Sequence, residues 1–333
     1  MSKISVTSGD VARLAKVSQS AVSRTFSEGA SVSEKTRKRV LEAAEALGYR
    51  PNALARAMIS GRSRLIALVV AYLENQFYPV MIEQMARGLR AHDYQVMLVM
   101  ADPGDQDRIV QTMLQYQVEG IVMASATLSS GLARECVKTG TPVVLFNRYV
   151  PGSATSSVTS DNVEGGRMVA HFLATGGHKR IAFIAGNEDS STNRDREAGF
   201  HKGLAERGVA LFSREVGGYT FAGAAEATRR MFAARRAPDA VFVANDHMAF
   251  SVMDVLRNEL KLRVPEDISV VGYDDVPEAG WGGYGLTTIE QPSGPMVQAT
   301  IEILLDQIAR KTVERRAAVL PARLIVRSSA RVP

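Results

Sequence analysis

Polar side chains with ligand-binding chemistry follow three of the apolar runs in this sequence. Asn147-Arg148 comes directly after PVVLF, Asn245-Asp246 follows VFVA, and Asp274-Asp275 follows SVVGY. Amide and carboxylate groups of this kind can hold vicinal hydroxyls of a small molecule. Asn and Asp are also common helix caps and turn residues. The functional interpretation therefore depends on whether these side chains converge on one cleft.

A second chemically informative segment lies near the N-terminus, in DVARLAKVSQSAVSR, residues 10–24. Its spacing predicts a helix, a four-residue turn and a second helix, whose buried faces carry Val11, Leu14, Ala15, Ala21 and Val22. The second helix then presents polar residues outward, namely Gln19, Ser20, Ser23 and Arg24. Side chains of these types read base edges and bind phosphates in the major groove of DNA. An ordinary pair of packed helices is the alternative for this segment alone.

Helix-capping signals support this pattern. Thr7 followed by Asp10 fits a capping box at the start of the first helix, and Ser18 can cap the second. A third amphipathic helix is predicted from Ser33 to Leu47, ending at Gly48. The three predicted helices form a small all-α module.

Charge is unevenly distributed along the chain. Residues 1–64 carry 12 Lys+Arg against 5 Asp+Glu, and the remainder carries 28 against 30, which together give the net charge of +5. A basic head on a nearly neutral body is typical of a protein with a nucleic-acid module at one end. A solvated basic face is the alternative, but the charge lies beside the predicted helix-turn-helix.

Short apolar runs alternate with helical periodicity from Leu65 onward. One series ends at PVVLF and a comparable series follows Asp161. Strands alternating with helices predict parallel sheets covered by helices on both faces, and two series predict two lobes. In such sheets ligands bind beyond the carboxyl ends of the strands, which is where the polar pairs described above lie.

Several classes of protein are disfavoured by the sequence. The N-terminus lacks the apolar core of a secretory signal and no apolar run is long enough to span a bilayer, so we expect a cytoplasmic protein without a membrane partner. The single cysteine, Cys136, allows no internal disulfide. Nucleophile, zinc and P-loop motifs are missing. Residues Gly280–Gly285 match a dinucleotide-binding pattern, but a strand rather than a helix follows them. We expect no cofactor, no metal and no enzymatic activity.

The sequence resembles the LacI/GalR family of bacterial transcription regulators. The marks in the N-terminal part are DVARLAKVSQSAVSR, VSEKTRKRV and LGYRPNALARAM. Those in the body include TPVVLFNR, GGHKRIAFIAG, REAGF, VFVANDHMA, VPEDISVVGYDD and LTTIEQP. Their order and spacing make the resemblance far more specific than a lone helix-turn-helix.

The resemblance implies an α/β fold class: an all-α helix-turn-helix head (residues 1–50), a hinge helix and linker (51–64), and a body (65–333) for ligand binding and dimerisation. The body is expected to resemble periplasmic sugar-binding proteins, with two doubly wound parallel-sheet lobes and a ligand cleft between them. Lobe 1 is expected over about 65–160 and 292–322, and lobe 2 over about 161–291 and 323–333. The connecting strands are expected to cross near Asp161, Gln291 and Arg323.

The resemblance also assigns ligand contacts to Asn147, Arg196, Asn245 and Asp274. Phe77 and Tyr78 lie in the loop predicted before a helix starting at Pro79, where relatives place aromatic rings over a flat ligand face. Burial against that helix is the alternative for both rings. Trp281 is a further candidate for the rim of the cleft, although GWGGYG departs from the segment usual before LTTI.

On the DNA side, the resemblance implies contacts from two segments. In the head they come from Thr7, Ser18, Gln19, Ser20, Ser23 and Arg24. In the hinge they come from Asn52, Ala55 and Met58, in a helix too short to be stable alone. We expect it to fold when two copies pair in the minor groove, where Met58 replaces the leucine wedge of many relatives. Palindromic operator DNA and paired hinges both imply a homodimer.

The sequence therefore predicts a ligand-responsive regulator, a repressor of transcription that binds operator DNA as a dimer with a sugar-like effector. A sugar acid or nucleobase acting as co-repressor is the alternative effector. A sugar-metabolising enzyme would need a catalytic constellation, and a sugar-transport binding protein would need a signal peptide and would lack the helix-turn-helix. Effector identity and operator sequence are not encoded in any motif.

Overall fold

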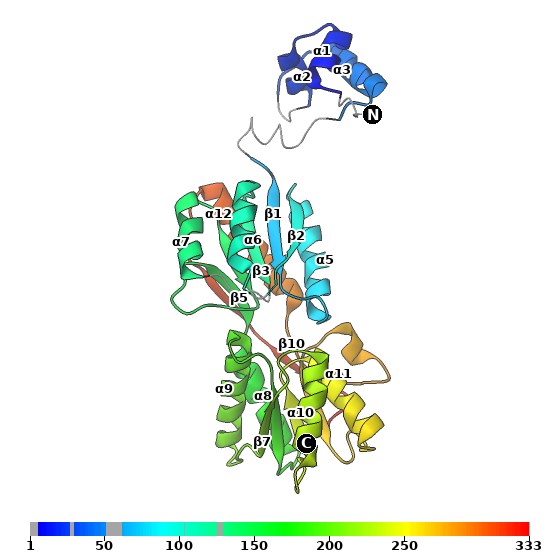
Figure 1. The fold of residues 1–333 in the computed structure, drawn as a ribbon, viewed down its shortest axis with the longest axis vertical. Coiled ribbons are helices and arrows are strands. Elements are labelled where there is room, and N and C mark those ends of the chain that lie inside the picture. The colour runs from blue at the N-terminus through cyan, green and yellow to red at the C-terminus, as the bar shows by residue number, and fades with distance from the viewer. Residues whose placement is uncertain (1–5, 27–29, 51–61, 103, 125–128, 333) are drawn as a thin grey trace. The chain divides into compact units, whose positions relative to one another are not determined.

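The structure, a computed structural model, describes residues 6–26, 30–50, 62–102, 104–124 and 129–332. The chain divides into two compact units, Met1–Arg64 and Leu65–Pro333, here called the head and the body (Figure 1). Each unit has its own core, and each is described by itself below.

The head is built from three helices, α1 (Ser8–Ala15), α2 (Gln19–Thr25) and α3 (Glu34–Leu47). The predicted capping box is confirmed, because Thr7 Oγ1 accepts from the Asp10 N–H and Asp10 Oδ2 accepts from the Thr7 N–H at 2.9 Å. Ser18 and Ser33 cap α2 and α3, and Gly48 ends α3 in the left-handed conformation with φ +63°. The Thr7, Ser18 and Ser33 side chains accept from N–H groups at the helix starts, and the Gly48 N–H donates to the last carbonyls of α3.

The core of the head differs from the prediction at one residue. Val11 and Ala15 are buried as expected, but Leu14 is 52% exposed and Ala12 takes its place on the buried face. The apolar stripe of α1 is therefore shifted around the helix toward Ala12, and it packs against Val22 and Val40. The predicted hinge contacts Asn52, Ala55 and Met58 lie outside the described residues.

Lobe 1 of the body has a six-stranded sheet in the order β11-β5-β4-β3-β1-β2, in which all neighbouring strands are parallel. Its strands are β1 (Leu65–Val70), β2 (Gln95–Met100), β3 (Gly120–Ala124), β4 (Val143–Phe146), β5 (Ser156–Ser160) and β11 (Ala317–Leu320). Its helices are α5 (Phe77–Arg90), α6 (Gln106–Gln115), α7 (Ser130–Thr139) and α12 (Ser293–Arg310).

Both faces of this sheet are covered. Ile66 and Leu68 of β1 pack with the core that includes α5 and α12, whereas Ala67 and Val69 pack with the core that includes α6 and α7. This alternation is what a doubly wound parallel sheet requires, since successive side chains of a strand point to opposite faces. Cys136 is a buried residue of α7.

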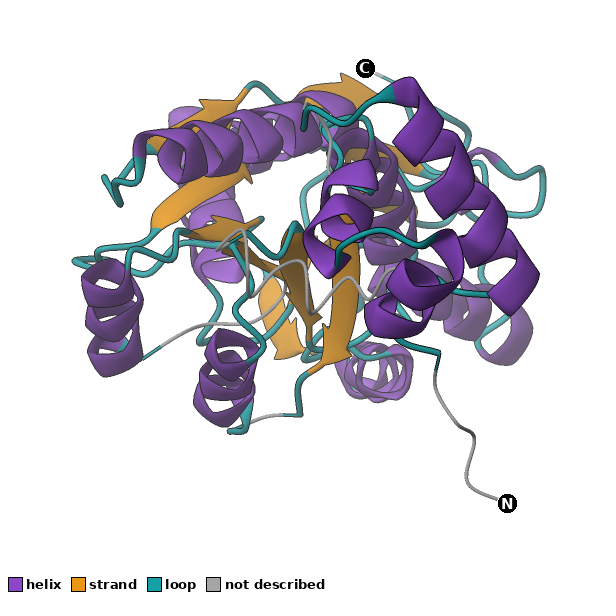
Figure 2. Cartoon of the chain, turned by 90° about the horizontal axis from the view of Figure 1, so that it is seen from above, coloured by secondary structure: helices purple, strands orange, loops and turns teal. Residues whose placement is uncertain are grey.

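Lobe 2 has a second six-stranded sheet, in the order β12-β10-β9-β8-β6-β7, in which only the β10–β12 pair is antiparallel. Its strands are β6 (Ile181–Ala185), β7 (Ser213–Val216), β8 (Ala240–Val243), β9 (Ser269–Asp274), β10 (Thr287–Glu290) and β12 (Arg323–Ile325). Its helices are α8 (Asn162–Thr175), α9 (Ser191–Glu206), α10 (Phe221–Ala233) and α11 (Asp246–Asp254), with the shorter turns η1 (Val255–Glu259) and η2 (Pro277–Gly280). The predicted α/β fold class with two such lobes is confirmed, and Figure 2 shows the sheets flanked by helices.

The chain passes three times between the two sheets. It leaves β5 for α8 at Asp161, leaves β10 for α12 at 291–292, and leaves β11 for β12 at 321–322. Residues near these passages are therefore well placed to respond to any change in the arrangement of the lobes.

Helices α8 and α9 approach each other unusually closely. A Cβ atom added to Gly199 of α9 would lie 1.9 Å from the Val163 carbonyl oxygen, and one added to Gly166 of α8 would lie 2.1 Å from the Arg196 carbonyl oxygen. Only glycine permits such backbone contact without displacement. This contact fixes the position of Arg196 on α9 relative to the start of α8.

Two local predictions are corrected and one is confirmed. Helix α5 begins at Phe77 rather than Pro79, so Phe77 and Tyr78 belong to its first turn. Strand β7, with the sequence SREV, was not predicted because it lacks an apolar run. The Gly280–Gly285 segment is a turn followed by strand β10, so it does not open a helix as a dinucleotide-binding motif would.

Candidate functional site

The exposed face of helix α2 carries the residues predicted to contact DNA. Gln19, Ser20, Ser23 and Arg24 are all exposed, whereas Ala21, Val22 and Thr25 are buried. Gln19 Nε2 donates to Ser8 Oγ at 2.8 Å, and the Ser18 and Ser20 hydroxyls lie 2.9 Å apart. This face is polar, partly pre-ordered and open to a partner, as major-groove recognition requires.

Two arginines of α3, which the sequence analysis did not single out, hold the helix-turn-helix together. Arg37 Nη1 donates to the Thr25 carbonyl at the end of α2, at 3.1 Å. Arg39 Nη2 donates to the Ala15 carbonyl and to the Lys16 carbonyl at the end of α1. Part of the positive charge of the head thus lies at helix C-termini, where it offsets the negative end of the helix dipole.

In the body, the four predicted ligand contacts converge on one small cavity. Asn147 follows β4, Arg196 lies on α9, Asn245 caps α11 and Asp274 ends β9, and all four line the cavity. Tyr78 lines it as well, from the first turn of α5. The lining residues therefore come from both lobes, and their side chains meet although most are far apart in the sequence.

Arg196 is fully buried and held by several partners. Its Nε donates to Asn162 Oδ1 at 2.9 Å, its Nη1 donates to the Ala244 carbonyl at 2.5 Å, and its Nη2 lies 3.5 Å from Asp274 Oδ1. Its guanidinium also stacks over the Tyr273 ring, 3.7 Å from the ring centre. Arg196 thus has protein partners for much of its hydrogen-bonding capacity and forms part of the cavity wall.

Asp274 joins the two lobes and one of the passages between them. It accepts a hydrogen bond from Gln291 Nε2 at 2.6 Å and one from Asn75 Nδ2, in lobe 1, at 3.4 Å. Burial raises the pKa of this carboxyl group, and Arg196 acts in the opposite direction. Its backbone has φ +131°, a conformation that costs about 1–3 kcal/mol in a residue other than glycine and that clusters at functional sites.

Two amide groups in the cavity wall have unused hydrogen-bonding atoms. Asn147 Oδ1 and Asn245 Nδ2 are buried and have no hydrogen-bond partner within the described part of the chain. Asn245 Oδ1 meanwhile accepts from the Met248 N–H, so this residue is a helix cap and still has a donor to offer. A buried unpaired acceptor and donor cost free energy that a ligand hydroxyl, which both donates and accepts, can recover.

Five further residues line the cavity: Tyr72, Asn75, Arg148, Thr192 and Tyr219. Arg148 had been named among the polar residues at strand ends, and the other four had not been predicted. They follow strands β1, β4, β6 and β7, so the strand-end rule that found Asn147 also applies to them. Burial raises the pKa of the Tyr72 and Tyr78 hydroxyls, which therefore stay protonated and can donate hydrogen bonds. Tyr219 was missed because strand β7 was missed.

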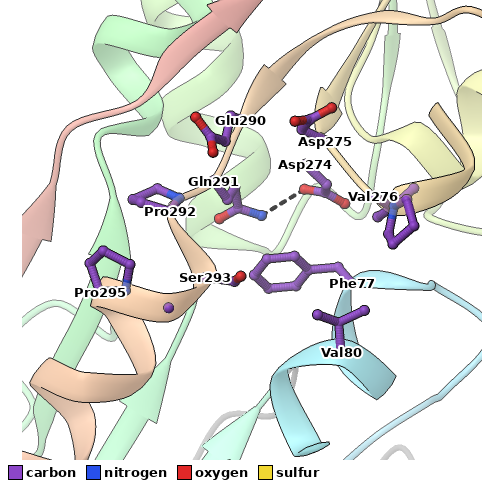
Figure 3. A pocket seen from close by; sticks show the side chains of 12 residues that line it. Phe77, Val80, Asp274, Asp275, Val276, Glu290, Gln291, Pro292, Ser293 and Pro295 are labelled. Atoms are coloured by element: carbon purple, nitrogen blue, oxygen red, sulfur yellow. Dashed lines mark hydrogen bonds between the residues drawn. The ribbon is translucent and has the colours of Figure 1, made fainter. Parts of the chain in front are cut away.

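Phe77 does not line this cavity. It lies on an adjoining pocket of about 240 Å³ together with Asp274, Gln291 and the start of α12 (Figure 3). Its ring stacks on Phe146 at 6.2 Å and is buried, which agrees with the packing alternative for this residue. Trp281 is 58% exposed and lines neither space.

The cavity formed by Asn147, Arg196, Asn245 and Asp274 is nearly filled by its own side chains. Its volume is about 10 Å³, which is the space that a single water molecule needs. In this arrangement of its walls the cavity has no room for a metabolite.

Neither a metal site nor a membrane-spanning helix is found among the described residues. These residues contain no group of three or more His, Cys, Asp and Glu side chains able to hold a metal ion. None of their helices is both long and apolar enough to cross a membrane.

Comparison with known proteins identifies both units. Residues 7–52 match the model of bacterial regulatory proteins of the lacI family, and residues 169–330 match the periplasmic binding protein-like domain. The chain is 31% identical to the HTH-type transcriptional repressor PurR of Photobacterium profundum, covering 96% of this chain and 97% of that protein. The chain belongs to the LacI family.

Other members of the LacI family support the same conclusion. The ribose operon repressor of Escherichia coli K12 is 31% identical over 96% of this chain and 98% of its own length. The structure of the lac repressor dimer bound to operator and the anti-inducer ONPF is similar with a TM-score of 0.87, at 28% identity over 98% of this chain and 99% of that one. The regulator CelR in complex with cellobiose is 31% identical with a TM-score of 0.73, covering 97% and 99%.

This LacI-family protein is therefore a transcriptional repressor with a DNA-binding and an effector-binding domain. Both curated relatives named above are repressors.

Proposed function

We propose that the protein is a cytoplasmic repressor that binds a palindromic operator as a homodimer and carries no catalytic activity. A small sugar-like effector in the cavity between the lobes alters the affinity for the operator. The observation that supports the effector site most directly is the pair of unpaired amide atoms, Asn147 Oδ1 and Asn245 Nδ2, beside the buried Arg196–Asp274 pair.

Hydrogen bonds made by the cavity wall connect the effector site to the passages between the lobes. Ser160 Oγ, at the end of β5, donates to Gln291 Oε1 at 3.1 Å, and Gln291 in turn donates to Asp274. Asn162, just after the first passage, accepts from Arg196. An effector that competes for Asp274 or Arg196 therefore disturbs the hydrogen bonds of Gln291 and Asn162, which lie at two of the three passages. Such differential contact is what couples ligand binding to a change of state.

A sugar acid or a nucleobase acting as co-repressor is the second candidate effector. Three tyrosines, Tyr72, Tyr78 and Tyr219, line the cavity, and aromatic rings can stack on a planar ligand. The amide pair and the carboxylate favour a hydroxylated ligand, which is why we place the sugar-like class first.

On DNA, we propose that Gln19 and Ser20 read base edges while Ser23 and Arg24 contact bases or nearby phosphates. Thr7 and Ser18 are proposed to contact the DNA backbone in addition to capping their helices. Asn52, Ala55 and Met58 remain predicted contacts of the hinge, with Met58 as the wedge in the minor groove.

Dimerisation has a candidate surface in lobe 1. Strand β2 is the edge of its sheet, and its residues Leu98 and Met100 are 45% and 49% exposed. An exposed apolar edge strand is a site where a second chain can pack. A two-fold dimer built there presents two heads, as a palindromic operator requires.

Operator selection followed by anisotropy tests the proposal. A random palindromic DNA library is selected on the full chain, and the recovered duplex is titrated with and without candidate effectors. We expect saturable, sequence-specific binding that at least one sugar-like compound changes by about 5–150-fold. Absence of specific DNA binding would contradict the regulator assignment, and an operator affinity that no metabolite alters would contradict the effector-linked mechanism.

A further inference from the structure

Arg148 is a cation at the effector cavity that the protein leaves without a counter-ion. Its side chain lines the cavity, and among the described residues it forms no ion pair or hydrogen bond through its guanidinium. It follows Asn147 directly at the end of β4, so its backbone is fixed by a buried strand. This contrasts with Arg196, which is paired with Asp274.

The charges around the cavity do not balance. Its lining contains two guanidinium groups, Arg148 and Arg196, and one carboxylate, Asp274. Asp274 already accepts from Gln291, Asn75 and Arg196, so it has little capacity left for Arg148. Counted over the lining residues, the cavity therefore carries an excess of one positive charge, and that charge is on the half-buried Arg148.

The groups next to Arg148 are suited to an anion. Arg148 acts on the pKa of both Tyr72 and Tyr78 in the direction of lowering it, which places its charge near these two hydroxyls. Both hydroxyls are protonated, Tyr72 donates to Tyr78, and their rings lie edge to face at 5.4 Å, so the Tyr78 hydroxyl keeps its proton for a ligand. A guanidinium beside neutral O–H donors is a common arrangement for a carboxylate or phosphate.

We infer that the effector is a hydroxylated anion, a sugar acid or a sugar phosphate, whose negative group pairs with Arg148 while its hydroxyls meet Asn147 and Asn245. This inference rests on the proposed effector site, and it places the anionic sugars, sugar acids included, ahead of neutral sugars. Arg196 then serves as a wall residue neutralised by Asp274, and Arg148 provides the selectivity for charge.

Matched compounds test the inference on the full chain. Three sets are titrated by calorimetry: glucose, gluconate and glucose 6-phosphate; ribose, ribonate and ribose 5-phosphate; and galactose, galactonate and galactose 6-phosphate. We expect an anionic member of at least one set to bind about tenfold or more tighter than its neutral parent, since a charged hydrogen bond contributes about that factor. The carboxylate and phosphate members of that set show which anion is preferred.

Two variants assign the preference to Arg148. Arg148→Gln should remove most of the difference in binding affinity between the anion and its neutral parent, and Arg148→Lys should keep part of that difference. Arg194→Gln is the control, because Arg194 is an exposed arginine that donates to the Asp189 carbonyl and does not line the cavity. It should keep the full preference. Added salt should weaken binding of the anion more than binding of the neutral sugar.

The outcomes are decisive for the charge inference and separable from the proposed function. Equal or tighter binding of the neutral members, no binding by any anionic member, or an unchanged preference in Arg148→Gln each overturns it. Operator anisotropy is measured in parallel. A neutral compound that alters operator binding at a lower concentration than its anionic counterparts overturns the charge inference and leaves the regulator proposal standing. Anion binding that depends on Arg148 but leaves operator affinity unchanged supports the charge inference and contradicts the proposed regulation.

Discussion

Replacing Arg196 with methionine should destabilise the body strongly, before any effect on ligand binding is considered. The substitution keeps much of the buried volume but leaves the Asp274 carboxylate without its cation and leaves the Ala244 carbonyl and Asn162 Oδ1 without their donor. Breaking a buried pair by removing one partner costs about 3–5 kcal/mol. At about 2 °C per kcal/mol for a domain of this size, the melting temperature should fall by about 6–10 °C.

A double-mutant cycle isolates the pair. Arg196→Met, Asp274→Leu and the double variant are unfolded by heat and by urea near neutral pH, with circular dichroism as the signal. Because the second substitution removes the charge that the first one strands, the double variant should lose about 2 kcal/mol less than the sum of the single variants. The reasoning would be refuted by losses of unfolding free energy that simply add in the double variant, or by an Arg196→Met protein with the melting temperature of the wild type.

The pH dependence of Arg196→Met gives an independent check with a definite sign. Burial raises the pKa of Asp274, and Arg196 is the largest opposing influence. Without Arg196 the folded-state pKa of Asp274 rises further above its unfolded value, so the folded state binds the proton more tightly than the unfolded chain. Stability from this group is then present at low pH and is lost as pH rises through the folded pKa. The deficit of the variant relative to wild type should therefore shrink on acidification.

Three further outcomes are expected. Gln19→Ala should weaken the selected operator by about 1–3 kcal/mol in anisotropy and relax preference at one base position; uniform weakening on all sequences would contradict base reading. Leu98→Asp should shift the dimer toward monomer in light scattering, and an unchanged dimer would exclude the β2 edge. Gly199→Ala should lower the melting temperature because its Cβ meets a backbone oxygen, whereas Gly282→Ala, with open space around it, should not; equal melting of the two would contradict the α8–α9 contact.

The features that the sequence predicted well depend on hydrogen bonds between residues close in the chain, or on where the strands of a sheet end. The caps at Thr7, Ser18 and Ser33 follow from residues three positions apart, and the structure confirms their hydrogen bonds. The convergence of Asn245 and Asp274 followed from a topological rule, because β8 and β9 are neighbouring parallel strands whose carboxyl ends meet at one edge of a sheet. Neither prediction needed the packing of distant side chains.

The features that were missed depend on side-chain direction or on contacts across the chain. Phe77 and Tyr78 are neighbours on one helix turn, yet only Tyr78 reaches the cavity, because successive side chains point in different directions around a helix. Leu14 was expected in the core for its apolarity, but Ala12 occupies the buried face. The Gln291–Asp274 bond joins two residues whose proximity only the folded sheets establish.

The glycine contact between α8 and α9 bears on how this repressor can acquire new ligands. Gly166 and Gly199 leave no room for side chains, so α9, the helix that carries Arg196, cannot slide or tilt without breaking its backbone contact with α8. Tyr72, Arg148 and Tyr219 stand instead on loops after strands, where substitution disturbs less backbone packing. Laboratory selection for altered effectors should accordingly accumulate changes at these loop positions and leave the Gly166, Gly199 and Arg196 positions untouched.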